Sequence, residues 1–112
     1  MTHSVLIPLI LIPLIMLIAG VLLLLNPPKT INNFIGYRTK RSKESQKSWD
    51  YAQRKLGEGW IILSIVNFII PLTFYLLNIK TEYTFIAFFI VQIFILISPI
   101  FFIEKHLKEN RY

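Results

Sequence analysis

The chain has 112 residues, of which 54% are hydrophobic and only 16% are charged. A soluble domain of this length has too much surface for its volume to bury so many apolar side chains, so the composition excludes an ordinary soluble domain and favours one membrane domain over residues 1–112. There is no cysteine, which excludes disulfides, thiol catalysis and cysteine-based metal clusters.

Three apolar segments predict an all-α integral membrane protein with three transmembrane helices. The first covers residues 5–25, which as a helix spans about 31 Å, close to the hydrocarbon thickness of a bilayer. Pro8 and Pro13 are expected to bend it, and Pro27-Pro28 to end it. The alternative is a cleaved signal peptide, which needs basic residues before the apolar run. Residues 1–4 contain no Lys or Arg, so we expect a retained span.

The second segment covers residues 60–77 and the third covers residues 83–103, and the short link between them requires antiparallel neighbouring helices. Asn67 and Gln92 lie near the middles of these spans. Because an amide that faces lipid is costly, each is expected to point into the bundle or to an oligomer partner. No Asp, Glu, Lys, Arg or His lies in any span, which argues against proton relays, ion-coupled transport and intramembrane hydrolysis.

The basic residues predict the orientation. Of the twelve Lys and Arg residues, eight lie in the loop of residues 26–59, three in the C-terminal tail and one in the link. The positive-inside rule then places the loop and the C-terminus in the cytoplasm, with the N-terminus outside the plasma membrane. The net charge of +6 is thereby assigned to topology and to the anionic inner leaflet, and not to nucleic acid.

Within the loop, a turn-forming segment precedes a predicted short helix. Asn33 and Gly36 favour a compact turn, and the neighbouring Phe34, Ile35 and Tyr37 suit the head-group boundary.

Ser42 is the candidate N-cap of a helix over residues 43–56. Its apolar stripe, formed by Trp49, Ala52 and Leu56, predicts an interfacial amphipathic helix anchored by Trp49. Gly57 and Gly59 are expected to break this helix before the second span. Two interpretations stay open: the loop is only an orientation signal and anchor, or it is a recognition surface.

The string Asn33-x-x-Gly36-Tyr37-Arg38-Thr39, followed by Ser42, Trp49 and Ala52 and then by a transmembrane hairpin, resembles the SdpI family of bacterial membrane proteins. That family is named for immunity to a sporulation-delaying peptide toxin, and the resemblance covers most of the chain. Two positions depart from its pattern: Lys40 stands where many relatives have Pro, and Gln53 where Asn or His often follows the alanine. Larger members carry additional membrane segments before this unit.

The resemblance implies a non-catalytic protein that protects against a membrane-active peptide toxin. The alternative is a signalling module whose basic loop recruits a cytosolic regulator. Neither needs a cofactor, and the two histidines, His3 and His106, lie too far apart in sequence to suggest a metal site. The candidate functional residues are Asn33, Gly36, Tyr37, Arg38, Thr39, Ser42, Trp49, Ala52 and Gly57 in the loop, with Asn67 and Gln92 in the spans. If the loop is functional, Arg38→Ala or Trp49→Ala should abolish function and leave insertion intact.

Overall fold

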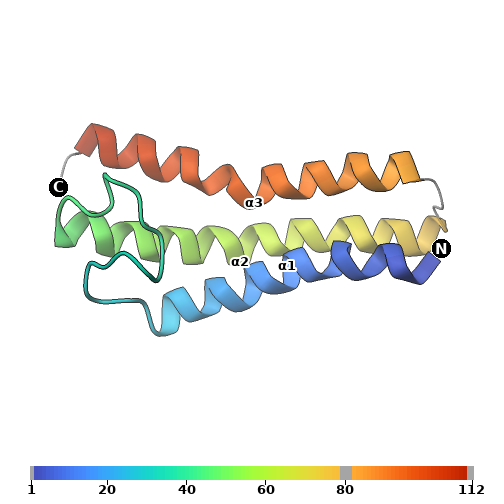
Figure 1. Cartoon of the computed structure of the whole chain (residues 1–112), viewed down its shortest axis with the longest axis horizontal. Helices are drawn as coiled ribbons and strands as arrows, with labels where there is room; N and C mark the ends of the chain where they lie inside the picture. The colour runs from blue at the N-terminus through green and yellow to red at the C-terminus, as the bar shows by residue number, and fades with distance from the viewer. Residues whose placement is uncertain (1, 79–81, 111–112) are drawn as a thin grey trace.

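The computed structural model describes residues 2–78 and 82–110, and within them it contains three helices and no strand. The helices are α1 (Thr2–Leu25), α2 (Gln46–Leu77) and α3 (Glu82–Asn110). All three are long and apolar enough to cross a membrane, which confirms the predicted all-α fold of a membrane-embedded protein. They run side by side in a body of 48 × 25 × 21 Å, and residues 26–45 fold against one end of it (Figure 1).

Helix α2 differs from the prediction, because it is one continuous helix from Gln46 to Leu77. The predicted separate amphipathic helix and the break at Gly57 and Gly59 are therefore wrong. Ser42 is not the N-cap either: Ser45 has an extended backbone, and its hydroxyl accepts a hydrogen bond from the Ser48 N–H at 3.0 Å. Most of the segment expected to lie on the leaflet, residues 46–56, instead forms about the first three turns of α2, which is long and apolar enough to cross a membrane.

A close crossing of α1 and α2 explains why a glycine lies inside a helix here. A Cβ atom added to Gly20 would lie 2.9 Å from the Gly57 carbonyl oxygen, and one added to Gly57 would lie 3.0 Å from the Gly20 carbonyl oxygen. Only glycine allows two backbones to approach this closely, and small residues commonly mark such crossings between membrane helices. Packing therefore outweighs the low helix propensity of Gly57.

The middle of the bundle is held by polar contacts at two prolines inside the helices. Pro13 and Pro71 lie inside α1 and α2, and each lacks the N–H that would bond the carbonyl four residues earlier. Those two carbonyls belong to Leu9 and Asn67, and the Gln92 side chain of α3 donates to both, at 2.8 and 3.3 Å. One amide thus replaces the donors that two prolines remove, and it ties all three helices together.

Asn67 completes these contacts from α2. Its amide nitrogen lies 3.1 Å from the Met16 sulfur and 3.4 Å from the Gln92 carbonyl oxygen. Both amides are fully buried, so the structure places them inside the bundle and away from lipid.

Candidate functional site: a loop fastened to the helix ends

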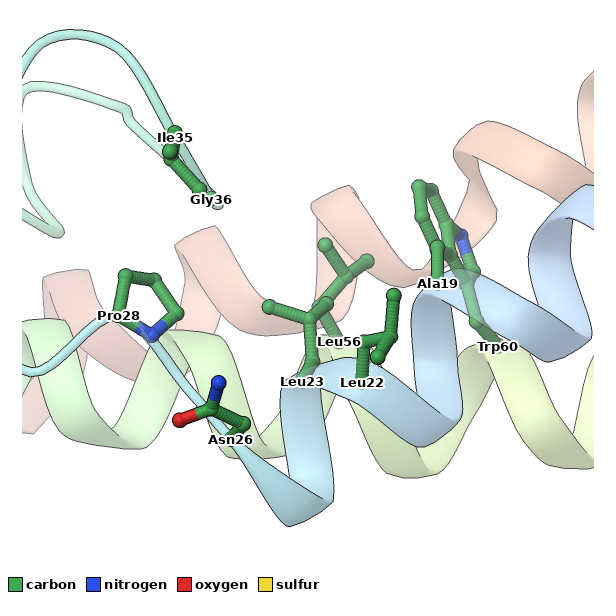
Figure 2. Close-up of a pocket in the computed structure, with 9 residues that line it drawn as sticks. All are labelled: Ala19, Leu22, Leu23, Asn26, Pro28, Ile35, Gly36, Leu56 and Trp60. Atoms are coloured by element: carbon green, nitrogen blue, oxygen red, sulfur yellow. The ribbon is translucent and has the colours of Figure 1, made fainter.

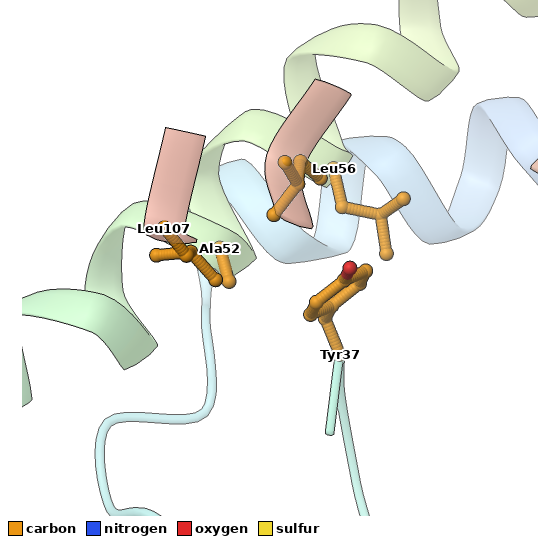
Figure 3. Packing of buried hydrophobic residues seen from close by; sticks show 5 residues of the cluster. Tyr37, Ala52, Leu56 and Leu107 are labelled. Atoms are coloured by element: carbon orange, nitrogen blue, oxygen red, sulfur yellow. The ribbon is translucent and has the colours of Figure 1, made fainter. Parts of the chain in front are cut away.

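Tyr37 lies at the centre of the contact between the loop and the helices. Its ring packs with the buried side chains of Ala52, Leu56, Ile103 and Leu107, which come from α2 and α3 (Figure 3). Its hydroxyl donates a hydrogen bond of 2.6 Å to the Glu104 carboxylate on α3. The loop is therefore held by both apolar and polar contacts at the same residue.

Gln53 on α2 holds the backbone of Tyr37 from the other side. Its Oε1 accepts from the Tyr37 N–H at 2.8 Å, and its Nε2 donates to the Tyr37 carbonyl at 2.8 Å. Gly36 makes room for this contact, since it has a φ of 97° and an added Cβ atom would lie 2.6 Å from the Gln53 Oε1. The glycine in the motif is thus required by both its backbone conformation and its close neighbour.

Glu104 gathers three loop side chains at the end of α3. Besides Tyr37, it accepts a hydrogen bond from the Thr39 hydroxyl at 2.7 Å and faces the Arg41 guanidinium at 3.6 Å. Burial, followed by the hydrogen bond and negative charge of Glu104, raises the pKa of Tyr37 far above its ordinary value. Tyr37 therefore keeps its proton, and remains a donor, at any physiological pH.

Ser42 and Thr39 close the tight turn that follows Tyr37. The Ser42 hydroxyl is fully buried, accepts from the Thr39 N–H at 2.8 Å and lies 2.8 Å from the Thr39 carbonyl. This places Ser42 inside the loop as a turn-forming residue, where it cannot cap α2.

Trp49 lies in the protein interior and not among lipid head groups. It is fully buried, and its indole N–H donates to the Pro28 carbonyl. The expected role as a membrane anchor is therefore wrong, because the apolar stripe of this part of α2 faces the folded loop and α3. Trp49 instead fixes the start of the loop to α2.

Arg38 and Asn33 form an exposed turn at the surface of the loop. The Arg38 guanidinium donates to the Asn33 carbonyl, and the Lys43 ammonium donates to the Asn33 side chain at 3.0 Å. Arg38 thus contacts its own loop, and the rest of its donor fork is available at the surface.

The structure brings together five of the predicted residues around Gln53 and Glu104. These five are Gly36, Tyr37, Thr39, Ser42 and Ala52. Gly57 lies apart at the crossing with α1, and Asn67 and Gln92 lie deep in the bundle.

Sequence reasoning missed the two residues that hold this site. Gln53 directly follows Ala52, and Glu104 is the first charged residue after the third apolar segment, at the level of the loop. Each had a signal in its position, but neither lies inside the motif string.

The side chains of this site hold the loop against α2 and α3. The described residues contain no group of three or more His, Cys, Asp or Glu side chains that could hold a metal ion. The Glu104 carboxylate accepts hydrogen bonds from two loop hydroxyls and faces the Arg41 guanidinium, so its described contacts all hold the loop.

Comparison with known proteins places this architecture in a family. The chain is 44% identical over 52 residues to the uncharacterized protein YfhL of Bacillus subtilis (strain 168), and this region covers 46% of the chain and 47% of that protein. The chain thus matches about half the length of this curated relative. No solved structure matches the chain. The model of the SdpI/YfhL protein family matches residues 29–103, which include most of the loop, α2 and most of α3, and the chain therefore belongs to the SdpI/YfhL protein family.

Proposed function

We propose that this protein protects the membrane that contains it against a membrane-active peptide toxin, without catalysis. The observation that carries the proposal is the family match over residues 29–103, because it includes the fastened loop and the helices that hold it. Immunity to a peptide toxin is the role after which the family is named, and here it is an inference from that resemblance.

The hydrogen bonding of the spans supports a non-catalytic role. The Ser64 and Ser98 hydroxyls donate to carbonyls of their own helices, at Ile61 and Ile95, over 2.7 and 2.8 Å. The amide nitrogens of Asn67 and Gln92 are engaged between helices. A nucleophile needs an adjacent base within hydrogen-bond reach, and these serines bond only to backbone oxygens.

A challenge experiment tests protection. The chain is produced in a bacterium that is sensitive to a sporulation-delaying peptide toxin, and survival is measured over a range of toxin concentrations. Glu104→Ala should reduce survival because it releases Tyr37, Thr39 and Arg41. Glu109→Ala, an exposed residue of the same helix, is the matched control. Unchanged killing with the wild-type protein present in the membrane would count against the proposal.

The orientation belongs to the same proposal, with the loop and C-terminus in the cytoplasm. Eleven of the twelve Lys and Arg residues lie on that side, which supports it by the positive-inside rule. The chain has no cysteine, so Lys47→Cys and Thr81→Cys each introduce one thiol for labelling. An impermeant maleimide should label intact cells only through Thr81→Cys, and the reverse pattern contradicts the proposed topology.

A second function is favoured by one observation. Phe34 and Ile35 are 84% and 67% exposed at the tip of a basic loop, which suits recruitment of a cytosolic regulator. A photo-crosslinker at Phe34 should then capture one defined soluble protein, and this capture should fall in Arg38→Ala. Crosslinks only to lipid would favour an interfacial role for the loop. Trp49 is unsuitable as the probe position, because loss of its buried ring would disturb the core.

A further inference from the structure

A cavity of ≈ 460 Å³ lies between the loop and the adjoining ends of α1 and α2 (Figure 2). Its volume is within the range of about 300–1,000 Å³ that is typical of small-molecule sites. Its lining includes Ala19 and Leu22 from α1, Leu56 and Trp60 from α2, and Ile35 and Gly36 from the loop. Apart from the Asn26 amide, the side chains that line the cavity are predominantly apolar, so an occupant would be held mainly by burial of hydrocarbon.

The limits of the apolar stretches place the cavity where hydrocarbon would give way to head groups. Ala19 and Leu22 belong to the last turns of the apolar stretch Leu6–Leu25, just before α1 ends. On α2, the charged residues Arg54 and Glu58 lie within one turn of the lining residue Leu56. A phospholipid contacts a membrane protein at this depth, with its acyl chains in the hydrocarbon layer and its phosphate in the head-group layer.

Two cations flank the lining segments of the loop. Lys29 directly follows Pro28, which also lines the cavity, and Arg38 lies two residues beyond Gly36. Both are exposed, and among the described residues neither forms an ion pair with a carboxylate, whereas Arg41, Arg54 and Lys55 do. Charge that the protein leaves uncompensated beside an apolar cavity suits an anionic head group.

We propose that this cavity binds one acyl chain of an anionic membrane phospholipid, with the lipid phosphate held by Lys29 and Arg38. The apolar lining accounts for the chain, the flanking cations account for the head group, and the boundary position accounts for both in one molecule. The lipid would fill the space between the loop and α1 that the chain itself leaves open.

Lipid retention tests the proposal. The full chain is placed in nanodiscs of equal phosphatidylglycerol and phosphatidylethanolamine, released into detergent, and examined by native mass spectrometry. We expect one retained lipid per chain, mainly phosphatidylglycerol. Ala19→Phe fills the cavity and should lower this retention about tenfold, because several methylene groups lose their burial. Ala87→Phe, at an exposed position of α3, should retain lipid as the wild type does.

A second variant keeps the test decisive if Ala19→Phe does not fold, which circular dichroism would reveal. Lys29→Gln leaves the cavity intact and should lower the preference for phosphatidylglycerol about fivefold. Lys108→Gln, exposed at the end of α3, is its control and should leave the preference unchanged. Absence of retained lipid in the wild type, or equal retention in folded Ala19→Phe, overturns the proposal. Equal retention of the two head groups by the wild type overturns the assignment of the phosphate to Lys29 and Arg38.

Discussion

Two glutamines hold this protein together, one beneath the loop and one in the middle of the bundle, and they do so differently. Gln53 uses both ends of its amide on one residue, accepting from the N–H and donating to the carbonyl of Tyr37. Gln92 uses only its nitrogen, which donates to the carbonyls of Leu9 and Asn67. The oxygen of Gln92 is buried and has no partner among the described residues, and the same is true of the Asn67 side-chain oxygen.

The two glutamines bond differently because different backbone groups beside them lack hydrogen-bond partners. Tyr37 lies in irregular chain, so both its N–H and its carbonyl need a partner. In the spans the backbone groups are bonded within helices, except where prolines remove donors, as Pro13 and Pro71 do beside Gln92. Only carbonyls are left over there, so only the donor half of an amide is useful. The same type of side chain thus supplies both an acceptor and a donor to the loop backbone, but only a donor to the backbone of the spans.

The largest expected effect is that of Gln53→Leu. It leaves the buried N–H of Tyr37 without a partner, at about 1–3 kcal/mol, and leaves the Tyr37 carbonyl with only the 3.3 Å hydrogen bond from the Ser42 hydroxyl. We expect the free energy of unfolding, measured by steric trapping in micelles, to fall by about 2–4 kcal/mol. Gln46→Leu, on the same helix, removes only exposed hydrogen bonds to the Lys29 carbonyl and the Asp50 side chain, and should change it by less than about 1 kcal/mol. A loss from Gln53→Leu as small as that of this control would remove the contrast between the two glutamines.

Gln92→Leu should lower the free energy of unfolding by only about 1 kcal/mol in the same assay, although Gln92 is as fully buried as Gln53. Hydrogen bonds between membrane helices contribute little on average, and the substitution also removes an oxygen that has no partner. A loss of stability that equals or exceeds that of Gln53→Leu would contradict the distinction between a glutamine that bonds both an N–H and a carbonyl and one that bonds only carbonyls.

Pro13→Ala sharpens the comparison further. It restores an N–H to α1 that can bond the Leu9 carbonyl, so the Gln92 donor becomes partly redundant. In a double-mutant cycle, Gln92→Leu should cost about 0.5 kcal/mol less in the Pro13→Ala background than in the wild type. Pro99→Ala on α3 is the matched control, and it should leave the cost of Gln92→Leu unchanged. Strict additivity of Pro13→Ala and Gln92→Leu would refute the proposed replacement of the missing donor.

The smallest expected effect on stability at neutral pH is that of the ionisation of Tyr37, which becomes measurable only at alkaline pH. Because the folded state raises the pKa of Tyr37, its contribution is fully present below the unfolded value of 10.0 and is lost as pH rises above it. Stability of the wild type should therefore fall more steeply above about pH 10 than that of Tyr37→Phe. Thermal unfolding between pH 8 and 11 measures the two slopes, and parallel curves would show that the tyrosine proton plays no part.

The sequence predicts the three spans because long apolar runs dominate their local physics. It fails where a distant contact decides the outcome. Gly57 reads as a helix break until Gly20 is known to lie against it, and Trp49 reads as a lipid anchor until Pro28 is known to cover it. The role of Gln92 was partly accessible, since each proline identifies the carbonyl four residues earlier as one that needs a donor. The position of Glu104 beside the loop was visible in the sequence, but its partner was not, because nothing local links Glu104 to a tyrosine far earlier in the chain.

That separation has a consequence for how the protein is made. Tyr37 and Glu104 are 67 residues apart, so during synthesis at about 5–20 residues per second the tyrosine waits roughly 3–13 s before its carboxylate partner exists. Throughout this interval the loop cannot close on α3, and the apolar side chains around Tyr37 lack their partners Ile103 and Leu107. Closure of the loop is therefore a late event in biogenesis, and it reports that the last helix has arrived.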